Sequence, residues 1–81
     1  MSQIFVGNLS FNTTEESIEN YFSKIVKPES VKIIKDKATG MSKGFGFVEI
    51  PDEFEEKVIS VFNLSVLDGR KIRVKKSVHD R

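Results

Sequence analysis

Several residue types that build chemical sites are missing or scarce in this chain. It has 81 residues, no cysteine and one histidine, His79. Without cysteine there is no disulfide framework and no thiolate metal site. His79 lies in the C-terminal tail, where we read it as a solvated residue. We therefore expect no metal and no cofactor.

Long apolar runs are also missing. No segment reads as a signal peptide, and no apolar stretch is long enough to span a membrane. The sequons at Asn8, Asn12 and Asn63 are therefore interpreted as coincidental. We expect an intracellular protein that makes no membrane contact.

The formal net charge is only +1, but the charges are segregated along the chain. Seven of the twelve acidic residues lie in two segments that read as helices: Glu15, Glu16, Glu19, Asp52, Glu53, Glu55 and Glu56. Basic residues concentrate elsewhere: Lys32, Lys35, Lys37, Lys43, Arg70, Lys71, Arg73, Lys75 and Lys76. A polyanion would meet a basic face although the whole chain is almost neutral.

The most informative segment is an octamer, KGFGFVEI, which spans residues 43–50. With the two-residue period of a strand, one of its faces carries Lys43, Phe45, Phe47 and Glu49. Aromatic residues in strands usually belong to the core. A face that also holds a lysine and a glutamate is hard to bury, so we expect both rings to lie toward solvent. There they are suited to stack with nucleobases.

A second short apolar strand, IFVGNL, spans residues 4–9 near the N-terminus. Its alternation places Gln3, Phe5 and Gly7 on one face and Ile4 and Val6 on the other. This strand, predicted over about residues 3–8, again pairs an aromatic side chain with a polar neighbour.

Two helices are expected between the strands. Thr13 or Thr14 can cap the first, which should end at Lys27-Pro28 because proline disfavours helical geometry in the residue before it. Its apolar stripe consists of Ile18, Tyr21, Phe22 and Ile25. The second follows Pro51, and Asp52 with Glu55 has the spacing of a capping box. Its predicted core face consists of Phe54, Val58, Val61 and Phe62, with Ile59 beside it.

The two remaining strands complete the pattern. Val31 and Ile33 mark one strand, with Ile34 on the open face, and residues 36–42 read as a hairpin loop in which Gly40 takes positive φ. A turn at residues 67–70 leads into the last strand, where Ile72 and Val74 face the core. Lys71, Arg73 and Lys75 should face outward. The glycines of the octamer should face inward, where a helix can approach closely.

The resulting order, βαββαβ, predicts an α+β fold of the ferredoxin-like class. It is a sandwich of one four-stranded antiparallel sheet and two helices. Both helices should cover the same sheet face, because only one face is consistently aliphatic.

On its two motifs the sequence resembles the RNA recognition motif (RRM) family, whose nucleotide-binding fold is also called the alpha-beta plait. The octamer matches the first six positions of the family's RNP motif, Lys/Arg-Gly-aromatic-Gly/Ala-aromatic-aliphatic, while Ile50 replaces the final aromatic. IFVGNL matches the family's hexamer. Where the family usually has glycine after each helix, this chain has Val26 and Leu64. A non-glycine residue at such a cap costs about 1 kcal/mol or forces another turn.

The resemblance implies the strand order 4-1-3-2 and one RRM domain over residues 1–81, with a core of about 3–76 and a tail at 77–81. It also implies binding of single-stranded RNA and a role in post-transcriptional RNA metabolism. Phe5 and Phe47 would stack two successive bases, Phe45 would pack against the sugars, and Lys43 would contact the phosphate between them. The other candidate RNA-binding residues on this face are Gln3, Glu49, Lys71, Arg73 and Lys75.

Three alternatives to RNA binding differ in class. One is an RRM-like module for protein–protein interaction, and another binds single-stranded DNA. The third is an enzyme such as an acylphosphatase, but residues 8–12 lack the basic residue that its phosphate loop needs. We expect a monomer that binds single-stranded RNA, has no small-molecule substrate and catalyses no reaction. It would be cytoplasmic as a bacterial single-domain protein, and nuclear or cytoplasmic as a eukaryotic one.

Overall fold

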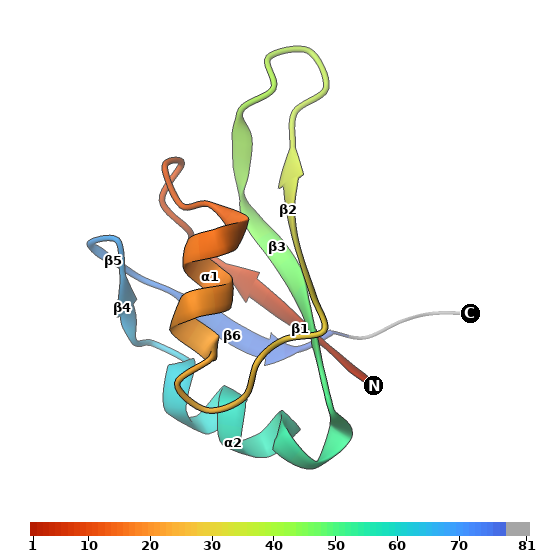
Figure 1. Ribbon diagram of the computed structural model, residues 1–81. Helices are drawn as coiled ribbons and strands as arrows, with labels where there is room; N and C mark the ends of the chain where they lie inside the picture. Colours follow the sequence, from red (N-terminus) through yellow and green to blue (C-terminus); the bar gives the residue numbers. More distant parts are fainter. Residues whose placement is uncertain (78–81) are drawn as a thin grey trace.

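The computed structural model describes residues 1–77 (Figure 1). His79 and residues 78–81 of the predicted tail lie outside the described residues. The elements in chain order are β1 (Ser2–Gly7), α1 (Glu15–Phe22), β2 (Ser30–Lys35), β3 (Ser42–Ile50), the 3-10 turn η1 (Asp52–Phe54), α2 (Glu55–Phe62), β4 (Val66–Leu67), β5 (Arg70–Lys71) and β6 (Arg73–Lys76).

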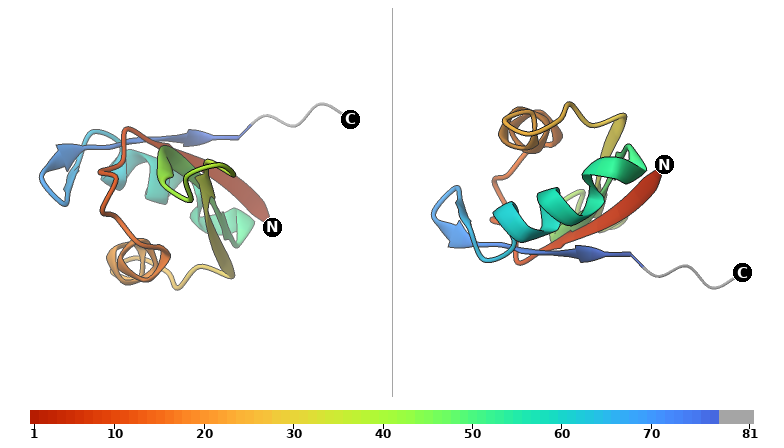
Figure 2. Two further views of the ribbon diagram at one scale, coloured as in Figure 1. Left: turned by 90° about the horizontal axis from the view of Figure 1, so that it is seen from above. Right: turned by 90° about the horizontal axis from the view of Figure 1, so that it is seen from below.

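The main sheet has four antiparallel strands in the order β2-β3-β1-β6. With β6 counted as the fourth strand, this is the predicted order 4-1-3-2. Both helices lie on the same side of the sheet, which leaves the opposite face open (Figure 2). The predicted ferredoxin-like fold is confirmed.

The core forms between the helices and the inner sheet face. Alternate residues of β1 and β3 are fully buried, as the two-residue period predicts: Ile4, Val6, Val48 and Ile50. From the helices, the rings of Phe22 and Phe62 stack in parallel with centroids 4.6 Å apart. Ile72 and Val74 also face the core, as predicted.

Helix α1 begins as predicted but ends early. Thr14 caps it, since the Ser17 N–H donates to Thr14 Oγ1 at 3.1 Å. The helix ends at Phe22 and not at Lys27-Pro28. The Ser23 hydroxyl donates to the Glu19 carbonyl at 2.6 Å, and Ile25 N–H turns back to the Phe22 carbonyl at 3.0 Å. These bonds close the last turn well before the proline.

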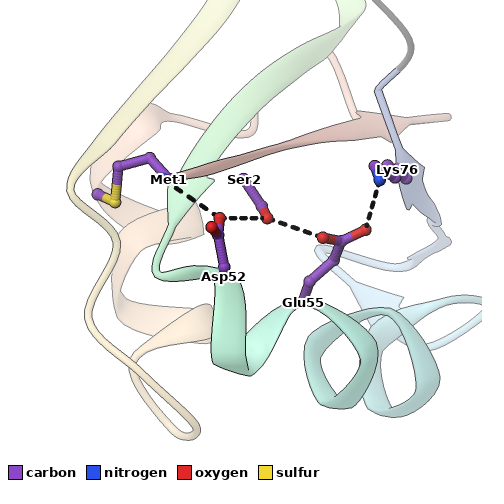
Figure 3. Close-up of polar contacts among 5 residues, drawn as sticks. All are labelled: Met1, Ser2, Asp52, Glu55 and Lys76. Atoms are coloured by element: carbon purple, nitrogen blue, oxygen red, sulfur yellow. Dashed lines mark hydrogen bonds and ion pairs between the residues drawn. The ribbon is translucent and has the colours of Figure 1, made fainter.

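The predicted capping box of α2 is wrong. Phe54 is the residue before the helix, and no side chain caps it. The carboxylates of Asp52 and Glu55 instead point at the Ser2 hydroxyl of β1, with oxygens 2.8 and 2.7 Å from Ser2 Oγ (Figure 3). The single hydroxyl proton donates to either oxygen. Lys76 Nζ lies 3.7 Å from the other oxygen of Glu55, so this cluster ties β1 and β6 to the start of α2.

Three further sequence predictions need correction. Val61, expected in the core, is 48% exposed, because the buried stripe of α2 is Val58 and Phe62. Gly46 faces the backbone of β2 and not a helix: a Cβ atom there would overlap the Lys32 carbonyl oxygen. Lys71 belongs to the separate β4–β5 hairpin and not to the main sheet.

Among the turns with a positive-φ residue, one has a glycine at that position and another has a leucine. Gly40 has φ of 76° in the loop between β2 and β3, as predicted. After α2, Leu64 takes the left-handed conformation with φ of 67°, at the position where a glycine is usual.

No helix within residues 1–77 is long and apolar enough to cross a membrane.

Candidate nucleic-acid interface

Three phenylalanine rings lie together on the open sheet face. Phe5 of β1 is directly opposite Phe47 of β3, and Phe45 lies two residues away on the same side. The ring centroids are 5.8 Å apart for Phe5 and Phe45, 5.9 Å for Phe5 and Phe47, and 6.3 Å for Phe45 and Phe47. All three side chains are partly exposed. We call these residues the three-ring platform.

Gly7 allows the Phe5 ring to lie over its own strand. A Cβ atom at Gly7 would come within 2.7 Å of Phe5 Cε2 and 2.9 Å of Cζ. Any larger residue would therefore push the ring off the strand. The small residue at this position of the hexamer thus sets the position of one ring of the platform.

Two lysines flank the rings in a row across the sheet. The cross-strand pairs are Lys32 with Phe47, Phe47 with Phe5, and Phe5 with Lys75, so the four side chains share one face. The Lys75 ammonium lies 5.4 Å from the centroid of the Phe5 ring, a cation–π contact. We call Lys32, Phe47, Phe5 and Lys75 the central row. Lys32 was not among the predicted site residues.

Polar residues occupy the neighbouring row. Gln3 is opposite Glu49, and Glu49 is opposite Ser30. Ser77 binds Gln3 twice: its N–H donates to the Gln3 backbone oxygen at 3.0 Å, and its hydroxyl donates to Gln3 Oε1 at 3.1 Å. The Ser30 hydroxyl donates to Glu49 Oε1 at 3.3 Å. Part of the hydrogen-bonding capacity of both predicted residues is thus used within the protein.

Two of the three remaining predicted cations border the platform. Lys43 and Arg73 are exposed and line a hollow together with Phe5 and Phe45. Lys71 is exposed on the β4–β5 hairpin, where its backbone oxygen accepts a hydrogen bond of 2.6 Å from Asn8 Nδ2. Of the three cations predicted on the last strand, the main sheet therefore carries Arg73 and Lys75 but not Lys71.

Comparison with known proteins agrees with this architecture. Glycine-rich RNA-binding protein 1 of Mycosarcoma maydis is 42% identical over 74 residues, which are 90% of this chain and 42% of that protein. The chain thus spans less than half the length of this curated relative. The crystal structure of RNA Binding Protein PG1 is 30% identical with a TM-score of 0.91, and the match covers 100% of this chain and 99% of that one. The second RRM domain of the yeast poly(U)-binding protein is 26% identical with a TM-score of 0.88 and the same coverage.

The match to the family itself rests on a sequence model. The model of the RNA recognition motif matches residues 4–73, which include both the hexamer and the octamer. The strand order and the solved structures with similar folds agree with that match. This chain therefore belongs to the RNA recognition motif family.

Proposed function

We propose that this chain binds single-stranded RNA on the open face of its sheet and acts in post-transcriptional RNA metabolism. The observation that carries the proposal is the three-ring platform with a lysine at each end of its central row. Unpaired bases expose both ring faces, so fixed aromatic rings can stack them while cations neutralise the phosphates. The names of the relatives, which include RNA-binding and poly(U)-binding proteins, support the same ligand class.

The roles proposed for the individual residues are those that the family resemblance implies. Phe5 and Phe47 stack two successive bases, Phe45 packs against the intervening sugars, and Lys43 contacts the phosphate between them. Lys75 would change position when RNA binds. Its ammonium covers the Phe5 ring in the free protein, so a base that stacks on Phe5 displaces it toward a phosphate.

The expected affinity is modest. Each stacked base contributes about 1–3 kcal/mol, and two or three of them, less the cost of ordering a flexible strand, give a roughly micromolar Kd. Neutralising about three phosphates on a single strand gives a slope of log K against log salt of about −2. Both values are accessible to fluorescence or NMR titration.

The direct test removes one ring at a time. Phe47→Ala and Phe5→Ala should each weaken binding to a mixed-sequence octanucleotide RNA pool by about 1–3 kcal/mol, while circular dichroism shows an intact fold. Met41→Ala is the matched control, because Met41 is apolar, 57% exposed and outside the platform. Unchanged titrations for both phenylalanine variants would refute the platform as the RNA site.

The test for RNA against DNA uses the same titration. Octanucleotide RNA and DNA pools of matched composition differ chiefly in the 2′-hydroxyl, which only RNA offers to protein donors and acceptors. We expect tighter binding of the RNA pool. Equal or tighter binding of the DNA pool would favour a general single-strand binder.

A further inference from the structure

Phe11 is an exposed aromatic ring that neither sequence motif contains. It is 65% exposed, in the loop between β1 and α1. Single exposed apolar side chains are common on protein surfaces. Phe11 differs from these because the residues on both sides of it are fixed and because a hollow lies next to it.

Both ends of the loop are anchored. Leu9 is buried, and its N–H donates to the Gly44 carbonyl of β3 at 2.8 Å. Thr13 is also buried, and its hydroxyl donates to Asp68 Oδ2 at 2.7 Å. A Cβ atom at Gly44 would lie 3.7 Å from Phe11 Cε1, so the ring edge is beside the octamer strand. The loop on both sides of Phe11 is thus anchored before any ligand arrives, which lowers the entropy cost of ordering it on binding.

The hollow next to Phe11 is continuous with the three-ring platform. It has a volume of about 330 Å³, and Phe5, Phe45 and Phe11 all line it. That volume lies within the usual range for small-ligand sites. Because Phe5 and Phe45 belong to both surfaces, a strand stacked on the platform can continue into the hollow.

The charged side chains that line the hollow are all positive. Lys43, Arg70 and Arg73 line it, and no carboxylate does so among the residues that the structure describes. Arg70 is held in position by Asn8: its Nη2 donates to Asn8 Oδ1 at 2.6 Å, and its Nε donates to the Asn8 carbonyl at 3.2 Å. A guanidinium has five N–H donors, so others remain to bind an anion.

We propose that this hollow binds one further nucleotide of the RNA strand, with its base stacked on Phe11 and its phosphate beside Arg70 and Arg73. The inference rests on the proposed RNA-binding function and extends the binding site beyond the two bases assigned to Phe5 and Phe47. A nucleotide combines a phosphate group and an aromatic base, which match two arginines and an exposed ring that line one hollow.

The test compares RNA pools of two lengths. Phe11→Ala should bind a mixed-sequence dinucleotide pool as the wild type does, because two nucleotides occupy only Phe5 and Phe47. For the octanucleotide pool its Kd should rise about five-fold or more, the effect of losing one stacked base. Phe11→Tyr should bind the octanucleotide pool with the wild-type affinity, whereas Phe11→Leu should bind it more weakly. Met41→Ala again serves as the control on a neighbouring loop.

The outcomes separate this inference from the proposed function. If Phe47→Ala weakens octanucleotide binding and Phe11→Ala does not, the further subsite is refuted and the platform stands. An equal loss for both RNA lengths would also refute it, because Phe11 would then act only by supporting Phe45. A wild-type protein that binds neither pool would overturn both proposals.

Discussion

Replacing Gly46 with alanine is the sharpest test of how the octamer is packed. Gly46 is buried on β3, opposite Ile33 of β2. A Cβ atom there would lie 3.0 Å from Ile33 Cα and would overlap the carbonyl oxygen of Lys32. Both atoms belong to the backbone, so no side chain can rotate away, and β2 must separate from β3.

The size of the effect follows from this geometry. Adding one methyl group to a tightly packed interior costs about 1–3 kcal/mol, and a clash with backbone belongs at the upper end of that range. For a domain of this length, 1 kcal/mol lowers Tm by about 4–8 °C. The family's motif also admits alanine at this position, but the spacing of β2 and β3 in this chain leaves no room for a Cβ atom. We therefore expect Gly46→Ala to lose about 3 kcal/mol in the free energy of unfolding, with a fall in Tm of about 12 °C or more.

Thermal and urea unfolding followed by circular dichroism measure both quantities. The matched control is Gly40→Ala, because Gly40 has φ of 76° but open space where a Cβ would lie. That variant should lose only about 1 kcal/mol, the cost of a left-handed residue. If Gly46→Ala is no less stable than Gly40→Ala, the packing argument is wrong.

Two further predictions concern the turn after α2 and the polar cluster at its start. Leu64→Gly should raise the free energy of unfolding by about 0.5 kcal/mol or more, because Leu64 has φ of 67° and is half exposed; an unchanged or lower Tm would contradict this. Asp52→Asn should lower Tm near neutral pH. The hydrogen bond from the Ser2 hydroxyl, and then the amino group of Met1, lower the pKa of Asp52 below its usual 3.8. The folded state therefore favours the carboxylate, and this contribution is complete above pH 3.8 and is lost as the pH falls through the lower folded pKa. The Tm difference between wild type and Asp52→Asn should vanish in acid, and Glu53→Gln is the neighbouring control. A difference that persists in acid would show that the charge of the Asp52 carboxylate is not its cause.

The three rings could be assigned to one face from the sequence because a strand's period is local. Phe45 and Phe47 are two residues apart on one strand, and Phe5 follows the same alternation on another. Joining them into one platform needed the strand order, which came from the family resemblance. Lys32 was missed because its place opposite Phe47 depends on a register that shifts between Ile33 and Lys35.

Contacts between distant segments explain the remaining differences. The spacing of Asp52 and Glu55 fits a local cap, but the Ser2 hydroxyl, 50 residues away from Asp52, attracts both carboxylates. Phe11 lies in a loop, where no periodicity indicates which way a side chain points. Its position beside β3 depends on bonds from Leu9 and Thr13 to other parts of the fold.

The lysines at both ends of the central row also bear on self-association. Exposed aromatic rings on a soluble domain invite two copies to join face to face. In such a pair, Lys32 and Lys75 of one copy would lie close to the same lysines of the other copy, and these like charges would repel. RNA supplies phosphates that neutralise the lysines, whereas a second copy of the chain does not. We expect the same two charges that attract a nucleic-acid strand to keep the rings of separate molecules apart, most strongly at low salt.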